Sequence, residues 1–377
     1  MYIMKKGKAV VVGVGIVGAC CAYYAARSGI EVLALDASDI GKGTTDATGS
    51  SVTCVTKNSS ELLELTKRSM ALFQELQKDF NVFYRVDGSY ILSRSLEEEH
   101  FLLKRGAWLK EHGVDNKIIP GRELRNLLPY IHPDVKGALY TTKDAGISPR
   151  EGCLAIAKEA EKFGASIKTN TTVKDFYVVN DTIKGVITSS GTIECDYVVI
   201  AAGPWSGSLT EKIGLKIPLS LQKGESLITE PVNFHIKGQM LAADILIKKL
   251  NHSFPEEFST GMYVSQEPDM TMKLGNTREW ADFDLKTTER GRKGILEEVS
   301  KYFPELSHLN ICNHSVGFRA FTPYKRPFVC NIKKPKGLVL ACGHGGDGVA
   351  LAPITGWQVS QLLLGITTGL EDTLSYI

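Results

Sequence analysis

The sequence predicts a two-domain protein that mixes α and β structure, and four observations support this prediction. The chain has 377 residues, more than a single hydrophobic core usually serves. Residues 9–12 are apolar and mostly β-branched, and they precede a glycine-rich turn and an alanine-rich helix, which is typical of a buried parallel sheet. Residues 82–93 and 217–230 alternate in the period of sheet strands. Two further segments, 97–112 and 287–302, have the period of amphipathic helices over a sheet.

The composition is that of an ordinary globular protein. Hydrophobic residues make up 43% and charged residues 23%, and the formal net charge is +2. This balance gives no indication of a nucleic-acid or anionic-membrane partner. Lys5 and Lys6 before the apolar run 9–26 imitate a secretory signal, but its glycines fit a nucleotide-binding turn and no A-x-A-like cleavage site follows. No other stretch approaches the roughly 18 uninterrupted apolar residues of a membrane span.

The eight cysteines indicate neither a disulfide framework nor a metal site. None forms a C-x-x-C pair, and no group of cysteines and histidines has the spacing of a zinc or iron–sulfur site. Free thiols that pack as small hydrophobic side chains are typical of a reducing compartment. We therefore expect no metal and a cytoplasmic protein.

The first glycine-rich turn predicts a dinucleotide site. Gly13 permits the tight turn, Gly15 lets the backbone approach a diphosphate, and Gly18 lets the helix pack close to the strand. The diphosphate would lie at the positive end of the helix, and Asp36 after the second strand would bind a ribose. The expected contact residues are Gly13, Gly15, Ile16, Val17, Gly18, Asp36 and Ala37. This fingerprint does not separate FAD from NAD.

The segment 37–51 favours FAD. It is rich in glycine and hydroxyl side chains and has no core-forming period, and a loop of this length beside a nucleotide site is often functional. It resembles the segment that the family of D-amino-acid oxidase and glycine oxidase lays along the diphosphate and the isoalloxazine. The resemblance implies that Thr44 and Thr45 contact FAD and that Gly49, Ser50 and Ser51 lie near the flavin ring.

Three further segments resemble the same family in the same order. Val173 lies where family members bind adenine through the main chain, and 197–206 is similar to the strand that meets the cofactor with a glycine. The turn 343–348 precedes a helix expected at about 352–364, and its N–H groups would stabilise the negative charge of a reduced flavin. His344 is as consistent with a structural role as with a contact to the flavin. The implied contacts are Val173, Ala202, Gly203, Trp205, Gly343, His344, Gly345, Gly346 and Gly348.

The segment 317–323 carries the substrate signal. It resembles the family's G-x-R-P-x-T-P-D segment, whose arginine holds the substrate carboxylate, and a planar guanidinium suits this task. The resemblance assigns this role to Arg319, with a structural ion pair as the alternative. This chain departs from the pattern at Ala320, at Tyr324, and at Gly346, where glycine oxidase has a second arginine.

Two further residues are assigned to the substrate pocket by resemblance. Tyr263 matches a position where the family points a phenol into the active site, and an aromatic side chain packed in a sheet is the alternative. Ser51 would lie beside it. The sequence indicates no general base.

The resemblance implies two interleaved domains. The FAD-binding domain, Rossmann-like and of the glutathione-reductase type, would comprise residues 1–80, 145–215 and 315–377. A sheet-based substrate-binding domain would comprise residues 81–144 and 216–314. The substrate would lie between the sheet and the flavin, at the domain boundary.

The expected activity is oxidation of the C–N bond of a small amino acid or secondary amine, with hydride transfer to N5 of non-covalent FAD. An alternative is the FAD-bearing β-type subunit of a heteromeric sarcosine, proline, hydroxyproline, opine or glycine dehydrogenase, which would pass electrons to partner subunits. A second flavin, FMN, is expected only in such a complex, and 148–151 lacks the histidine that binds FMN covalently in sarcosine oxidase. A dehydrogenase of a non-amine such as glycerol 3-phosphate and a nucleotide-bound scaffold are also consistent with the sequence. The acceptor, the chirality of the substrate and the oligomeric state stay open.

Overall fold

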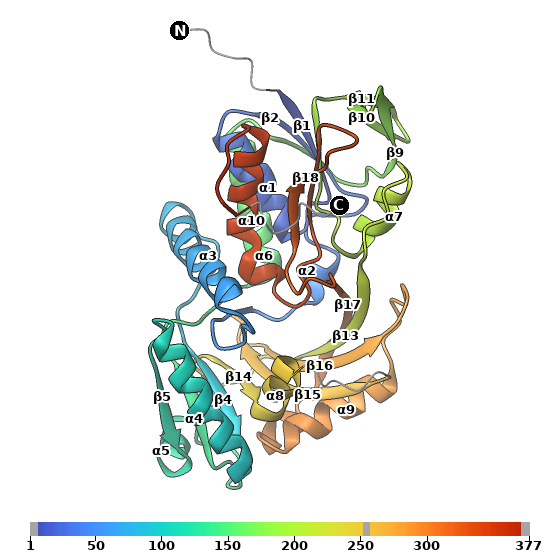
Figure 1. Ribbon diagram of the computed structural model, residues 1–377. Helices are drawn as coiled ribbons and strands as arrows, with labels where there is room; N and C mark the ends of the chain where they lie inside the picture. Colours follow the sequence, from blue (N-terminus) through green and yellow to red (C-terminus); the bar gives the residue numbers. More distant parts are fainter. Residues whose placement is uncertain (1–6, 252–256, 371–377) are drawn as a thin grey trace.

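The computed structural model describes residues 7–251 and 257–370, which form two lobes, each built on its own sheet (Figure 1). Residues 1–6, 252–256 and 371–377 lie outside the described residues. Lys5, Lys6 and the outer ends of the expected domain ranges are therefore not described. None of the helices in the two described ranges has the length and apolar character that a membrane crossing requires.

The first lobe contains a six-stranded, mostly parallel sheet. The central strands of this sheet are apolar and buried over most of their length, as expected for a sheet covered on both faces. In spatial order the strands are β18 (Phe328–Asn331), β19 (Leu338–Cys342), β12 (Tyr197–Ile200), β1 (Lys8–Val12), β2 (Glu31–Leu35) and β8 (Ser166–Lys168). Only β18 pairs antiparallel to its neighbour.

Alternate side chains of β1 enter two different cores, because successive residues of a strand point to opposite faces. Ala9 and Val11 belong to the core shared with the three helices on one face, α1 (Ile16–Arg27), α6 (Pro149–Lys162) and α10 (Gly348–Leu363). Val10 and Val12 belong to the core on the other face, covered by a small antiparallel sheet. That sheet consists of β9 (Val173–Val179), β10 (Thr182–Thr188) and β11 (Gly191–Glu194).

The second lobe contains an eight-stranded sheet. In spatial order its strands are β17 (Ile311–Phe321), β13 (Ser220–Thr229), β16 (Met272–Trp280), β15 (Ser259–Gln266), β14 (Gln239–Ala242), β4 (Ser89–Ser93), β6 (Gly137–Thr141) and β5 (Asn116–Pro120). Helix α9 (Glu289–Ser300) packs on one face, where Ile295 and Val299 join the apolar core of this lobe. The side chains on the opposite face of β13, β16 and β17 line a large cavity.

Shorter elements complete the fold around these sheets. The helices are α2 (Thr44–Ala47), α3 (Ser60–Asp79), α4 (Leu96–Glu111), α5 (Gly121–Leu127), α7 (Ser206–Glu211) and α8 (Ala243–Asn251). A two-stranded sheet joins β3 (Ser51–Val52) to β7 (Ala145–Gly146), and the 3-10 turns are η1 (Gly203–Trp205) and η2 (Pro304–His308).

The structure confirms most of the expected elements and corrects two. The expected helices 97–112 and 287–302 are α4 and α9, and 217–230 contains β13. The expected strand 82–93 is wrong over its first half, because the backbone turns at Phe83 (φ 58°) and Gly88 (φ 81°) and only the end of the segment is β4. The helix expected from about 352 begins one turn earlier, at the start of α10.

The proposed domain boundaries can be placed on these elements. β17 crosses the boundary proposed at 315, since it begins at Ile311 and pairs along its length with β13 in the second sheet. The division into interleaved domains remains a proposal, in which β17 would join the two parts.

Candidate functional site

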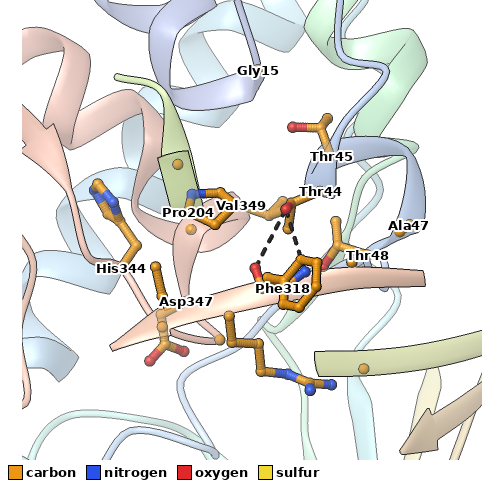
Figure 2. Close-up of a pocket in the computed structure, with 18 of the residues that line it drawn as sticks. Gly15, Thr44, Thr45, Ala47, Thr48, Pro204, Phe318, His344, Asp347 and Val349 are labelled. Atoms are coloured by element: carbon orange, nitrogen blue, oxygen red, sulfur yellow. Dashed lines mark hydrogen bonds between the residues drawn. The ribbon is translucent and has the colours of Figure 1, made fainter. Parts of the chain in front are cut away.

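A cavity of about 1410 Å³ lies between the two lobes and brings together most of the residues singled out in the sequence. It extends from the N-terminal end of α1 to the face of the eight-stranded sheet. Figure 2 shows α2 and β17 on its wall together with the turn before α10, represented by Thr44, Phe318, His344 and Asp347. The predicted residues on its wall are Gly15, Ile16, Val17, Asp36, Ala37, Thr44, Thr45, Gly49, Ser51, Val173, Ala202, Gly203, Trp205, Tyr263, Arg319, Gly343, His344, Gly345, Gly346 and Gly348.

Gly13, Gly18 and Ser50 do not line the cavity. Gly13 has a φ of 96°, in the left-handed region that favours glycine. A Cβ on Gly18 would lie 1.9 Å from the carbonyl oxygen of Gly13, so these two glycines allow the turn and the close packing of α1. The Ser50 side chain points away from the cavity, because its hydroxyl donates to Glu267.

The nucleotide end of the cavity is formed largely by backbone groups. The N–H of Ile16 donates to the Thr45 hydroxyl (3.1 Å), which holds α2 against the start of α1. The Asp36 carboxylate accepts hydrogen bonds from the N–H groups of Val14 (2.6 Å) and Ser38 (2.9 Å). The positive end of α1 therefore faces a cavity whose rim carries an oriented carboxylate, as a bound dinucleotide requires.

α2 is hydrogen-bonded to the strand that carries Arg319. The Thr44 hydroxyl lies 3.4 Å from the carbonyl oxygen and 3.5 Å from the amide nitrogen of Phe318, as the dashed lines in Figure 2 show. The N–H of Gly345 donates to the carbonyl of Ala320 (2.8 Å) on the other side of Arg319. Two segments of the first lobe thus position β17 from the second sheet.

Arg319 extends across the neighbouring strand toward β16. Its Nη1 donates to the carbonyl of Thr277 (3.2 Å), and a Cβ on Gly224 would lie only 2.4 Å from the same nitrogen. Gly224 of β13 therefore provides the space for this side chain. Burial lowers the pKa of Arg319 to about 10, which leaves the guanidinium charged at neutral pH, and no acidic residue of the described ranges contributes to this shift.

Tyr263 is buried in the sheet and also lines the cavity, so both interpretations drawn from the sequence describe it. Its phenol oxygen accepts a hydrogen bond from the N–H of Ser50 (3.1 Å) and lies 3.3 Å from the Ser51 hydroxyl. It also lies 3.4 Å from the amide oxygen of Gln239. Burial raises the pKa of Tyr263, so the phenol stays protonated at neutral pH.

The turn 343–348 places His344 beside α10. The ring Nε2 lies 3.0 Å from the Thr355 hydroxyl. Burial lowers the pKa of His344 to about 4, with Asp347 acting in the opposite direction, and the ring is therefore neutral at pH 7. A Cβ on Gly346 would lie 3.8 Å from Cδ of Arg319, so the position where glycine oxidase has a second arginine lies against the stem of Arg319.

The charged residues on the cavity wall that sequence reasoning missed include Lys57, Lys249, Arg278 and Asp347. Lys57 Nζ lies 2.5 Å and Lys249 Nζ 3.5 Å from the same oxygen of Asp347. Burial opposes ionisation of Asp347, but the two lysines hold its pKa well below the usual range. Asp347 could have been noticed as an acidic residue inside the turn 343–348. The three basic residues come from separate segments and form no local sequence pattern.

The model of the family "FAD dependent oxidoreductase" (DAO) matches residues 8–362. The chain belongs to this family. Glycine oxidase of Pseudomonas aeruginosa is 24% identical over 365 residues, which cover 95% of each chain.

Two solved structures are similar over nearly the whole chain. A glycine oxidase from Bacillus cereus has a TM-score of 0.87 and 24% identity and covers 98% of each chain. An L-proline dehydrogenase from P. horikoshii has a TM-score of 0.85 and 25% identity and covers 97% of this chain and 95% of its own. These similarities confirm the two-domain FAD-binding fold and the cofactor expected from the sequence.

The residues present fit FAD. The cavity is continuous from the N-terminus of α1 to Arg319, and a Cβ on Gly15 would reach 3.1 Å from the Thr45 hydroxyl, so the glycine keeps this passage open. Gly15, Ile16 and Val17 would hold the diphosphate, and Asp36 the ribose. The turn 343–348 would face the isoalloxazine.

Proposed function

We propose that this protein oxidises the C–N bond of a small amino acid or secondary amine that carries a carboxylate. The observation that supports this proposal best is Arg319, a partly buried guanidinium without a carboxylate partner among the described residues, on the wall of a cavity continuous with the nucleotide turn. Such a group favours an anionic ligand that replaces the lost hydration. FAD, when bound, supplies the hydride acceptor.

The chain's own residues orient the substrate and exclude water. Arg319 would bind the carboxylate through two parallel hydrogen bonds and thereby fix the carbon next to the nitrogen. The N-terminus of α10 and the N–H groups of 343–348 would stabilise the negative charge of a reduced flavin through their positive electrostatic potential. Tyr263 and His344 keep one protonation state near neutral pH, so neither is assigned as a base.

A panel of amines tests the proposal on the holoenzyme. We expect an amino acid or secondary amine to bleach the flavin absorbance anaerobically. Arg319→Met should lower kcat/KM about 100-fold, since one partner of a buried charge pair is removed, and Arg319→Lys should recover part of this loss. Arg292→Gln, which removes an exposed arginine of α9, serves as the control. Unchanged affinity of Arg319→Met for carboxylate inhibitors would contradict the assignment.

The same preparation distinguishes the electron acceptors. Hydrogen peroxide formed from the purified chain, an amine and oxygen identifies a self-contained oxidase. Flavin bleached by an amine but reoxidised only by an artificial acceptor identifies a dehydrogenase subunit that passes electrons to a partner. Glycerol 3-phosphate belongs in the panel as the non-amine alternative, and its oxidation in place of every amine would refute the proposal.

A further inference from the structure

The segment 44–50 of the cavity wall is bound to four adjacent strands of the eight-stranded sheet. Its contacts follow the spatial order of the strands β17, β13, β16 and β15. The pairs are Thr44 with Phe318, Ala47 with Ser226, Thr48 with Lys273, and Ser50 with Tyr263. A Cβ on Gly317 of β17 would lie 3.0 Å from the Cβ of Ala47, so the glycine allows this close approach. In Figure 2, Thr44, Ala47 and Thr48 lie along β17. The second sheet therefore fixes this segment along its whole length.

Lys273 provides the charged contact in this row. Its Nζ donates to the carbonyl of Asp46 (3.4 Å) and to the carbonyl of Thr48. The side chain is 4% exposed, and in the described part of the chain these two carbonyls are its hydrogen-bond acceptors. Burial lowers the pKa of Lys273, whereas the charges of Glu267, Asp46 and Glu151 act in the opposite direction. A buried amine without acceptors would be unfavourable, so the lysine and the segment hold each other in place.

The carbonyls of this segment determine where its N–H groups point. The successive carbonyls of Asp46, Ala47 and Thr48 all accept hydrogen bonds from side chains of the second sheet. In a planar trans peptide the N–H points opposite to the C=O, and the peptide bonds of this segment are trans. The N–H groups of Thr48 and Gly49 are therefore directed away from those side chains. Neither has an acceptor among the described residues, and both residues line the cavity. Two backbone donors thus remain for a ligand.

We propose that Lys273 is a positioning residue for the cofactor, which keeps the N–H groups of Thr48 and Gly49 available as donors to the flavin ring. In this role Lys273 acts through the backbone carbonyls that it holds and does not itself touch the flavin. Oriented N–H groups would stabilise the reduced flavin more than the oxidised flavin, because the reduced ring carries the negative charge. The inference depends on FAD as the cofactor and not on the proposed amine substrate.

Lys273→Met tests the inference on the full chain, because methionine retains most of the apolar stem and removes the donor. We expect the dissociation constant of FAD to rise about tenfold, measured by titration of the apoprotein with FAD. The absorbance bands of the bound flavin should shift, since the backbone around the ring is no longer fixed. The midpoint potential of the flavin should become more negative, because the reduced form loses more stabilisation than the oxidised form.

A second buried lysine of the same sheet provides the matched control. Lys223 on β13 is 1% exposed, pairs with Asp284 (2.7 Å) and does not line the cavity. Lys223→Met should therefore leave the affinity for FAD, the flavin spectrum and the midpoint potential unchanged. Ser226→Ala removes the hydroxyl that donates to the carbonyl of Ala47 (3.2 Å). This variant should change the same three quantities in the same direction as Lys273→Met, by a smaller amount.

The outcomes separate a positioning role from a merely structural one. Unchanged FAD affinity and midpoint potential in folded Lys273→Met, or equal changes in Lys223→Met, would overturn the inference. A weaker affinity with an unchanged potential and spectrum would also overturn it, because Lys273 would then only stabilise the fold. If Lys273→Met does not fold, Ser226→Ala decides: a more negative potential in a stable protein supports the inference, and an unchanged potential refutes it. None of these measurements requires that an amine be oxidised.

Discussion

The two ends of the cavity are built in different ways. The nucleotide end consists of glycines, backbone N–H groups and hydroxyls from segments close in sequence, such as 13–18 and 36–45. The substrate end consists of charged side chains from β16, β17 and α8, which come together only in the folded chain. The comparison suggests a division of roles in which cofactor binding would depend on backbone geometry, and substrate choice on the placement of charged side chains. Each of the following predictions tests one side of this contrast.

The largest effect is expected at the nucleotide end. Gly18→Val would place a branched side chain where a Cβ already lies 1.9 Å from a backbone oxygen, so α1 must shift. We expect a loss of about 4 kcal/mol or more of unfolding free energy and loss of bound FAD. Urea unfolding and flavin absorbance measure both. Gly207→Ala, whose Cβ would lie 4.0 Å from the side chain of Leu219, is the control and should keep FAD.

The next effect is expected at the ion pair between the two ends. Asp347→Asn removes the carboxylate shared by Lys57 and Lys249, which leaves the buried ammonium group of Lys57 and the partly exposed one of Lys249 without this partner. We expect a loss of about 3 kcal/mol in unfolding free energy, measured by urea titration. Asp181→Asn removes an exposed pair with Lys334 and should leave the free energy of unfolding nearly unchanged. Equal effects would show that the buried pair has no special weight.

The smallest effect is expected at Tyr263. Tyr263→Phe removes the acceptor of the Ser50 N–H and the contacts with Ser51 and Gln239. We expect a loss of about 1–2 kcal/mol in unfolding free energy, because a buried donor is left without its partner. FAD binding should be retained, since the ring still packs against Gly49. Loss of FAD in this variant would show that the phenol, rather than the backbone, holds the cofactor segment.

The nucleotide end could be predicted from sequence because its residues follow one another. Strand, glycines, helix and Asp36 form a local pattern whose spacing is imposed by backbone geometry. Arg319 was recognised in the same way, from the segment around it. Lys249 of α8 and Arg278 of β16 were not recognised, because they belong to separate segments. Only the packing of the folded chain brings both to the cavity wall. The strand predicted for the first half of 82–93 was wrong for a related reason. An alternating pattern of apolar residues does not reveal a positive φ such as that of Phe83.

The attachment of β17 to both α2 and the turn before α10 has a thermodynamic consequence. Phe318 and Ala320, on either side of Arg319, are hydrogen-bonded to Thr44 and Gly345, which line the nucleotide part of the cavity. A ligand that orders these segments also orders the guanidinium, so less conformational entropy is lost when an anion follows. Cofactor and anion should therefore bind with positive cooperativity, and the enhancement must be equal in both directions.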